Sequence, residues 1–132
     1  MILKKNIQED FLFTKDHEWM SQKDGALFIG ITDYAQEQLG DIVFIEIFKK
    51  NSEFKKGDIL GEIESVKSVS NILAPIDGTI IDINSTIVDT PELINSDPYN
   101  KGWILKYKAK NINQINSLMK VEDYKSYLNT LG

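Results

Sequence analysis

Short runs rich in β-forming residues recur along the chain, and they predict a protein built mainly from strands. Residues 41–48 are apolar on both sides of an alternating pattern, which predicts a strand buried on both faces. Residues 103–108 alternate between larger apolar side chains and a set that includes two lysines, as a half-buried strand does. The remaining strand candidates are residues 26–31, 58–64, 69–74 and 79–84.

Two stretches of the sequence predict helices. Residues 33–39 can form a short helix in which Asp33 is the N-cap and Gln36 completes a capping-box-like pair. Gly40 is placed to end this helix. Apolar residues at helical spacing predict a C-terminal helical segment at about residues 112–130.

The connections between these elements differ in character. Residues 49–57 form a charged loop that ends in a predicted turn at Lys56–Asp58. Residues 75–78 also predict a turn, because Pro75 fixes φ and Gly78 allows a positive φ. Residues 85–102 form a long connection without strong periodicity, and loops of this length in a compact domain tend to be functional.

Length and composition limit the class of protein. A chain of 132 residues fits one domain, residues 1–132, with a single core. The net charge of −5 argues against a nucleic-acid partner and fits partners that present basic surfaces. The chain has no cysteine, which excludes disulfides, thiol nucleophiles and thiolate metal sites. Any sulfur redox chemistry must therefore come from a cofactor.

The sequence also carries information about location. No apolar run approaches the length of a membrane span, so we expect no membrane association. Residues 1–10 lack a signal-peptide core, and they carry acidic residues but no arginine, unlike a transit peptide. We expect a cytoplasmic protein of a bacterium, with the mitochondrial matrix as the less favoured alternative.

Lys67 is the most informative position in the chain. It lies between two β-prone runs separated by a few small or polar residues, which predicts a hairpin within about residues 58–84. A lysine at such a tip exposes its amine to a modifying enzyme while the strands hold its backbone. The chain has fifteen basic residues, all lysine, so for one lysine taken alone an ordinary solvated turn is the stronger interpretation. The surrounding sequence must decide between an ordinary solvated turn and a lysine presented for modification.

Four separated blocks of the sequence resemble the glycine cleavage system H protein family, in the family's order. The third block holds Lys67 in Glu-Ser-Val-Lys-Ser-Val-Ser, followed by Ala-Pro-Ile-Asp-Gly. A lone Glu-Ser-Val-Lys would be a weak signal, whereas four ordered blocks are very specific. The other three blocks are residues 13–19, with a His-Glu-Trp core, residues 29–44, and residues 91–103.

The resemblance implies a fold and an activity. The fold would be mainly β, a flattened barrel or sandwich hybrid of the lipoyl/biotinyl carrier type with a short helix near 33–39 and C-terminal helices. The protein would carry a lipoyl group on Lys67 and have no catalytic group of its own. It would take an aminomethyl group from the glycine decarboxylase (P protein) to the aminomethyltransferase (T protein). Dihydrolipoamide dehydrogenase (L protein) would then reoxidise it, and the carrier would be monomeric.

The resemblance also implies roles for other residues. Glu64 would help a lipoate ligase or a lipoyl-transfer enzyme to recognise the hairpin, although an ordinary solvated carboxylate explains it about as well. His17, Glu18 and Asn71 would belong to the surface on which the loaded arm rests. The alternative for the His17–Trp19 segment is a structural start to the first strand. His17 is the only histidine, and no nucleophile or carboxylate cluster with ligand spacing predicts a catalytic triad or a metal site.

Two positions depart from the family's pattern. Many members have a carboxylate where this chain has Asn71, and some have a different, sometimes ionisable, side chain where it has Gln38. An amide can hydrogen-bond an amine but cannot form an ion pair with it. These departures concern how the loaded arm is held and leave the attachment site unchanged.

Two other functions stay open on the sequence alone. The chain could be a lipoyl carrier for another client, such as a relay to the 2-oxoacid dehydrogenases, because the same residues would serve both roles. It could also be an unmodified binding or structural β domain, although the intact motif from Glu64 to Lys67 argues against this. A free-standing enzyme is the weakest hypothesis, since no nucleophile, metal set or phosphate-binding glycine loop is present.

Overall fold

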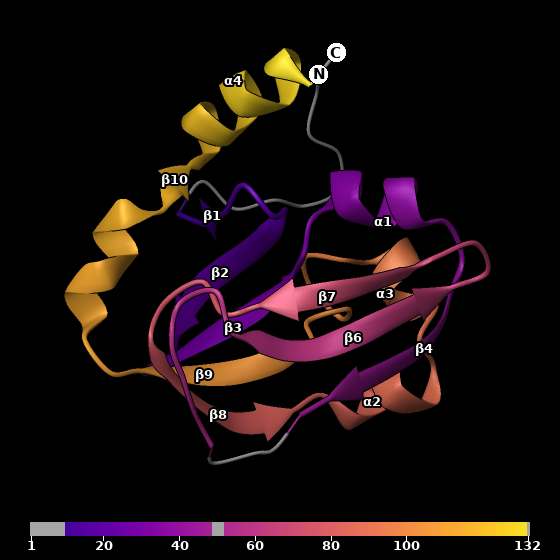
Figure 1. Cartoon of the computed structure of the whole chain (residues 1–132), viewed down its shortest axis with the longest axis horizontal. Helices are drawn as coiled ribbons and strands as arrows, with labels where there is room; N and C mark the ends of the chain where they lie inside the picture. Colours follow the sequence, from indigo (N-terminus) through magenta and orange to yellow (C-terminus); the bar gives the residue numbers. More distant parts are fainter. Residues whose placement is uncertain (1–9, 49–51, 132) are drawn as a thin grey trace.

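The structure, a computed structural model, describes residues 10–48 and 52–131. Most of its elements are short strands, and helices lie between strands and at the C-terminal end (Figure 1). In chain order the elements are β1 (Leu12–Phe13), β2 (Glu18–Lys23), β3 (Ala26–Ile31), α1 (Asp33–Leu39), β4 (Ile42–Ile47), β5 (Glu53–Phe54), β6 (Ile59–Ser65), β7 (Val69–Leu73), β8 (Gly78–Ile83), α2 (Ser85–Asp89), α3 (Leu93–Ser96), β9 (Leu105–Ala109), the 3-10 helix η1 (Ile112–Ser117), β10 (Met119–Lys120) and α4 (Val121–Thr130).

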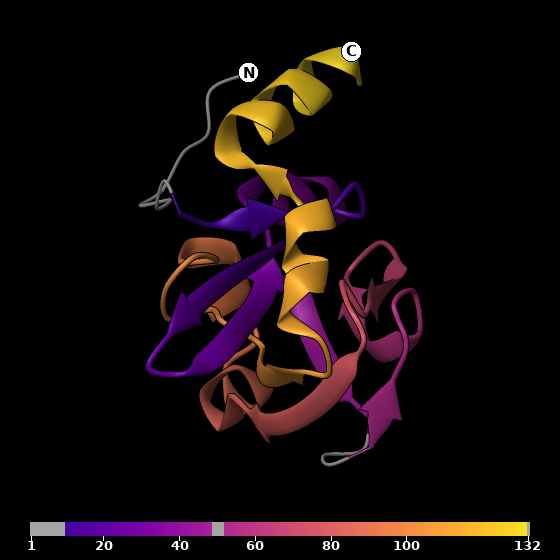
Figure 2. The same cartoon turned by 90° about the vertical axis from the view of Figure 1, so that its left-hand side faces the viewer.

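The strands of the described residues form two sheets rather than one closed barrel. The larger sheet has the order β10-β1-β2-β3-β9-β8-β5, and the smaller has the order β4-β6-β7. Figures 1 and 2 show α4 at the same end of the molecule as β1 and α1. The expected mainly β fold is therefore confirmed, as a sandwich-like pair of sheets. No helix in the described part of the chain is long and apolar enough to cross a membrane.

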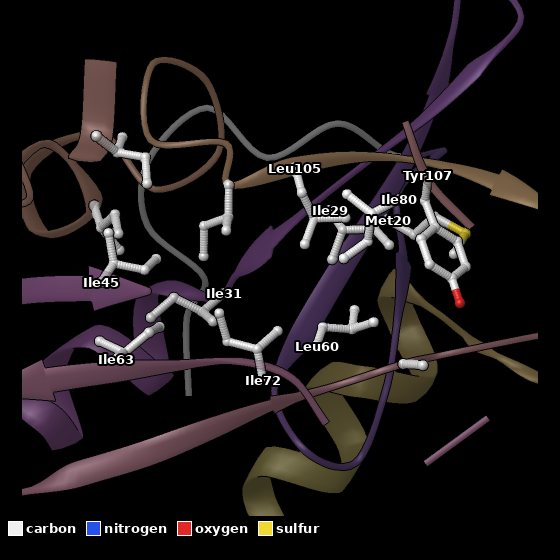
Figure 3. Close-up of a cluster of buried hydrophobic side chains, with 14 of the residues drawn as sticks. Met20, Ile29, Ile31, Ile45, Leu60, Ile63, Ile72, Ile80, Leu105 and Tyr107 are labelled. Carbon is white, nitrogen blue, oxygen red and sulfur yellow. The ribbon is translucent and has the colours of Figure 1, made fainter. Parts of the chain in front are cut away.

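A core rich in isoleucine lies between the two sheets. Figure 3 shows side chains from strands of both sheets pointing toward one another, among them Ile29 of β3, Ile63 of β6 and Ile72 of β7, each almost completely buried. Removing this apolar surface from water is the main favourable term in folding. A second cluster is aromatic, and in it Tyr124 and Leu128 attach α4 to β1 and β2.

Several predicted strands are confirmed. The strand at residues 26–31 has the predicted bounds, and β8 and β9 agree with the predicted strands to within one or two residues. The hairpin that presents Lys67 forms from β6 and β7, which pair antiparallel from Ile59↔Leu73 to Glu64↔Val69. The predicted turn at Lys56–Asp58 is also present, with Gly57 at a φ of 90°.

The prediction for residues 41–48 was wrong about burial. Strand β4 is an edge strand of the smaller sheet, and the side chains of Val43 and Phe44 are exposed. Its register against β6 shifts between Ile42 and Phe44, which is a β-bulge. A bulge adds one residue to one strand and breaks the alternation of sides. The alternation therefore could not assign the faces of this strand.

The predicted cap of the first helix was wrong by one residue. Thr32 is the N-cap, and its hydroxyl accepts a hydrogen bond from the N–H of Ala35. Asp33 is buried in the first turn, where its carboxylate accepts a hydrogen bond from the Gln36 side chain at 2.8 Å. Both residue types are good N-caps, so local chemistry could not separate them. Gly40 ends the helix with a φ of 79°, as expected.

The reason given for Gly78 was also wrong. Its φ is not positive, since it is the first residue of β8. A Cβ atom there would collide with the carbonyl oxygen of Lys108 and the ring of Tyr107. Glycine at this position therefore allows a close approach of two strands, as glycine inside strands often does.

Three regions differ from the prediction, two connections and the C-terminal segment. The long connection at 85–102 includes the short helices α2 and α3. In the predicted charged loop, residues 49–51 lie outside the described residues, and Glu53–Phe54 form β5 against β8. The C-terminal segment at 112–130 is not continuously helical, because β10 separates η1 from α4 by pairing with β1. Pairing with a distant strand has no local sequence signal.

Candidate functional site

The tip of the β6–β7 hairpin holds the exposed Lys67 on a fixed backbone. Ser65 is buried, and its hydroxyl oxygen accepts hydrogen bonds from the N–H groups of Lys67 at 3.3 Å and Ser68 at 3.1 Å. The N–H of Ser65 donates in turn to the carbonyl of Ser68 at 2.8 Å. Serine often forms such turns with the backbone two or three residues on. Ser65 was not among the predicted site residues, although this tendency of serine could have indicated it.

A second contact ties the tip to the loop between α1 and β4. The N–H of Val66 donates to the carbonyl of Asp41 at 3.0 Å, and the two loops lie side by side in Figure 1. A Cβ atom on Gly40 would lie 3.3 Å from Cε of Lys67. The aliphatic part of the lysine therefore runs along Gly40 before it reaches water.

A cleft of about 330 Å³ opens beside the hairpin tip. Its wall includes three of the predicted site residues, His17, Glu18 and Asn71, together with Gln38 of α1 and Ser68 of the tip. Four apolar side chains complete much of its lining, Ile31, Ala35, Leu39 and Ile63. The fold thus brings the predicted arm-resting residues together within one cleft next to Lys67.

Glu18 is only 2% exposed, and both of its carboxyl oxygens are engaged. Thr14 donates its hydroxyl to Oε1, and the N–H of Leu73 donates to Oε2, each at 2.9 Å. Burial raises the pKa of Glu18 to about 8, more than these two hydrogen bonds lower it. Glu18 therefore connects the start of β2 to the end of β7, and its raised pKa favours the neutral, protonated carboxyl.

His17 joins the cleft to the C-terminal helix. Its Nδ1 lies 2.8 Å from the hydroxyl of Tyr124, and that hydroxyl lies 2.8 Å from Oγ1 of Thr32. The imidazole packs against the rings of Tyr34, Tyr124 and Tyr127. Partial burial lowers the pKa of His17, which favours the neutral ring. His17 has a φ of 66°, which is uncommon for a residue with a side chain.

Glu64 lies apart from the cleft. It is exposed and stands opposite Val69 on the outer face of the smaller sheet, and its neighbour Ile63 points into the core. Glu64, for which the resemblance implies a separate role in recognition by the attaching enzyme, is thus not part of the cleft that His17 and Glu18 line. Among the described residues, no group of three histidine, cysteine, aspartate or glutamate side chains could hold a metal ion.

An exposed lysine on a hydrogen-bonded hairpin tip beside a small cleft is the arrangement of a swinging-arm carrier, a class of protein that moves a covalently attached group between enzymes. The family model described as "Glycine cleavage H-protein" matches residues 11–131, and the chain belongs to this family. The resemblance inferred from the four sequence blocks is thereby confirmed. Proteins of this family are lipoyl carriers and not enzymes, and this chain is such a carrier of the glycine cleavage system.

Individual relatives agree over nearly the whole chain. The glycine cleavage system H protein of Listeria monocytogenes serotype 4a (strain HCC23) is 46% identical over 123 residues, which cover 93% of this chain and 98% of the relative. A probable glycine cleavage system H protein of Pyrococcus horikoshii is 46% identical over 127 residues, covering 95% and 94%. The crystal structure of a glycine cleavage system H protein from Mycobacterium marinum superimposes with a TM-score of 0.84 at 33% identity, covering 93% and 99%.

Proposed function

We propose that Lys67 carries the lipoyl group and that the adjacent cleft is where the loaded arm rests. The observation that carries this proposal is the hairpin tip itself. Its lysine is exposed, its backbone is held by Ser65 and Asp41, and the residue after it lines the cleft. A tethered group meets each site at a high effective concentration, so a rigid tip and a mobile arm suit a shuttle.

The dimensions and chemistry of the cleft fit such a group. Its volume of about 330 Å³ lies near the lower end of the range for small-molecule sites, roughly 300–1,000 Å³. The apolar side chains of Ile31, Leu39 and Ile63 suit a hydrocarbon chain, and polar groups surround them. When bound, the lipoyl group supplies the disulfide and dithiol pair that this cysteine-free chain lacks.

The three predicted cleft residues would contribute in different ways. Glu18 would fix the wall of the cleft, because its two oxygens already hold Thr14 and Leu73. His17 would present a neutral imidazole whose orientation the Tyr124 hydroxyl sets. Asn71 would offer an amide that can hydrogen-bond an amine without an opposite charge.

The other components of the glycine cleavage system are the natural partners of such a carrier. We infer that the P protein loads the arm, the T protein unloads it, and the L protein reoxidises it. We also infer that the chain acts as one monomeric carrier domain in the bacterial cytoplasm. Glu64, exposed on the outer face of the hairpin, would be read by the enzyme that attaches the lipoyl group.

Mass spectrometry of the protein from its own cells tests this proposal. Peptide mapping should place one lipoyl group on Lys67, and Lys67→Arg should remove it and abolish glycine cleavage in a mixture with the P, T and L proteins. The matched control is Lys108→Arg, because Lys108 is an exposed lysine on β9. Modification at another lysine, or normal glycine cleavage by Lys67→Arg, would contradict the assignment.

A further inference from the structure

Four apolar side chains are exposed around the lysine, and we call them the tip patch. Val66 is 68% exposed, Val69 59%, Phe44 53% and Val43 52%. Single exposed apolar residues are ordinary, but a group of them beside a functional residue indicates an interaction site.

The backbone geometry shows why these side chains form one surface. Phe44 of β4 and Val69 of β7 are both register partners of Glu64 on the central strand β6. Paired residues of neighbouring strands point to the same side of a sheet, so these three side chains lie together on the outer face. The bulge in β4 lies at Val43, between Ile42 and Phe44, and so turns two consecutive apolar side chains outward. Bulges next to functional sites often redirect side chains in this way. The bond from Val66 to Asp41 brings the tip close to the start of β4.

Carboxylates border the tip patch on the same face of the sheet. Glu46 and Glu62 are register partners, and Glu64 lies two register pairs further along, opposite Phe44. Like charges directly opposite one another in a sheet are unfavourable. Within the described part of the chain, none of these three carboxylates forms an ion pair with a lysine or histidine side chain. A partner with lysine or arginine at this position would relieve the repulsion.

The short reach of the unmodified lysine indicates which partner must approach the tip patch most closely. A lysine amine extends only about 6 Å from its Cα, as five bonds of ordinary length allow. An enzyme that acylates the amine must therefore bring its active site against the tip, where it contacts the tip patch. The lipoyl arm lengthens this reach once it is attached, so later partners can stand further away.

We propose that the tip patch and the row Glu46, Glu62 and Glu64 together dock the enzyme that acylates Lys67. The partner surface would be apolar at its centre and basic at its rim. In the reaction, the neutral amine of Lys67 attacks the carbonyl carbon of an activated acyl donor, an acyl adenylate or a thioester. A C–N bond forms, the C–O or C–S bond to the leaving group breaks with its electron pair, and the amine gives up one proton to a base. The inference rests on the proposed attachment site.

Steady-state acylation of the full-length unmodified protein tests the docking surface. The probe is a purified lipoate ligase with lipoate and ATP, and intact mass gives the rate. Phe44→Ala combined with Val69→Ser should lower kcat/KM about tenfold or more, mainly through a higher KM, as loss of interface hot spots does. Val88→Ser is the matched control, because Val88 is a 48% exposed valine on α2 and should stay within about twofold of wild type.

The row Glu46, Glu62 and Glu64 is tested separately, through the salt dependence of acylation. Added salt should lower kcat/KM of the wild type, and the double variant Glu46→Gln, Glu62→Gln should lose most of this dependence. Glu53→Gln on β5, an exposed glutamate of the other sheet, should keep the salt dependence.

The outcomes separate this inference from the proposed function. If the wild type is acylated at Lys67 and the tip-patch variant behaves like Val88→Ser, the docking surface is wrong and the attachment site stands. If the variant is acylated normally but fails in glycine cleavage with the P, T and L proteins, these side chains serve a later step, through another partner or through the cleft that Val69 also lines, and the inference is overturned. If the wild type is not acylated at Lys67, both the inference and the attachment site fail.

Discussion

Replacing Glu18 by glutamine should make the protein more resistant to alkaline pH. The carboxyl is almost fully buried, and its pKa of about 8 in the folded protein compares with 4.5 for an unperturbed glutamate. Between these two values the unfolded chain has lost the proton and the folded chain keeps it. The folded state then binds more protons, so the stability of the wild type falls as pH rises through this window.

The size of the effect follows from the two pKa values. They are roughly 3.5 pH units apart, and each pH unit corresponds to about 1.4 kcal/mol, so the loss approaches roughly 5 kcal/mol above pH 8. Glutamine does not titrate, and it resembles the protonated acid. Its carbonyl oxygen can accept from the N–H of Leu73, while the Thr14 hydroxyl loses its acceptor, which should cost about 1 kcal/mol at every pH.

Urea unfolding at several pH values from about 5 to about 9 measures this difference. We expect the two proteins to be similar in stability at about pH 5 and Glu18→Gln to be more stable by several kcal/mol at about pH 9. Glu64→Gln controls for the loss of one negative charge at an exposed position, and its effect should stay within about 0.5 kcal/mol. A Glu18→Gln difference that does not change with pH would refute the raised pKa and the role of burial in it.

Three further substitutions test the geometry around the tip and the cleft. Ser65→Ala removes the acceptor for two tip N–H groups and should cost about 0.5–1.5 kcal/mol, with faster amide hydrogen exchange at Lys67. Gly40→Ala places a Cβ at a φ of 79° and a ψ of −160°, a region used almost only by glycine, and should cost about 1–3 kcal/mol in urea unfolding. Tyr124→Phe leaves the Nδ1 of His17 without its partner hydroxyl and should cost about 1–3 kcal/mol in the same assay.

Each of these substitutions has a matched control. Ser85 is exposed on α2, so Ser85→Ala should not change exchange at the tip. Gly25 also has a positive φ, but a Cβ atom there would meet nothing within 4 Å, so Gly25→Ala should disturb only the backbone. Tyr127 donates a longer, exposed hydrogen bond of 3.3 Å, so Tyr127→Phe should matter less than Tyr124→Phe. Equal effects within the serine pair or the tyrosine pair would contradict the corresponding contact. Equal effects of Gly40→Ala and Gly25→Ala would mean that backbone strain alone sets the cost at Gly40 and that the approach of Lys67 adds nothing.

Local sequence patterns predicted the hairpin and its lysine because the two strands are close in the chain and their pairing needs only a short turn. The same is true of the strand at residues 26–31 and of the turn at Gly57. The four blocks of family resemblance then gave the fold class and the carrier role. Neither the local patterns nor the family resemblance predicted the contacts that hold the cleft together.

The contacts that build the cleft connect residues far apart in the sequence. His17 and Tyr124 are separated by 107 positions, and Glu18 and Leu73 by 55. Nothing near Tyr124 indicates that its hydroxyl lies between His17 and a threonine of another element. The exposure of Phe44 was likewise not predictable, because the bulge beside it changes which side of β4 its neighbours occupy. Such features depend on tertiary packing, which overrides local preference.

Val69 belongs to both proposed surfaces, since its side chain is exposed at the hairpin tip and it also lines the cleft. An enzyme docked on the tip patch therefore contacts a residue that the arm would cover when it rests in the cleft. Before modification the whole patch would be available to the enzyme, and after modification the arm would cover part of that apolar area. Apolar contact contributes about 25 cal/mol per Å² of buried surface, so covering Val69 weakens the complex with the modified carrier. The hairpin would thus favour release of the modified protein without any change in its own conformation.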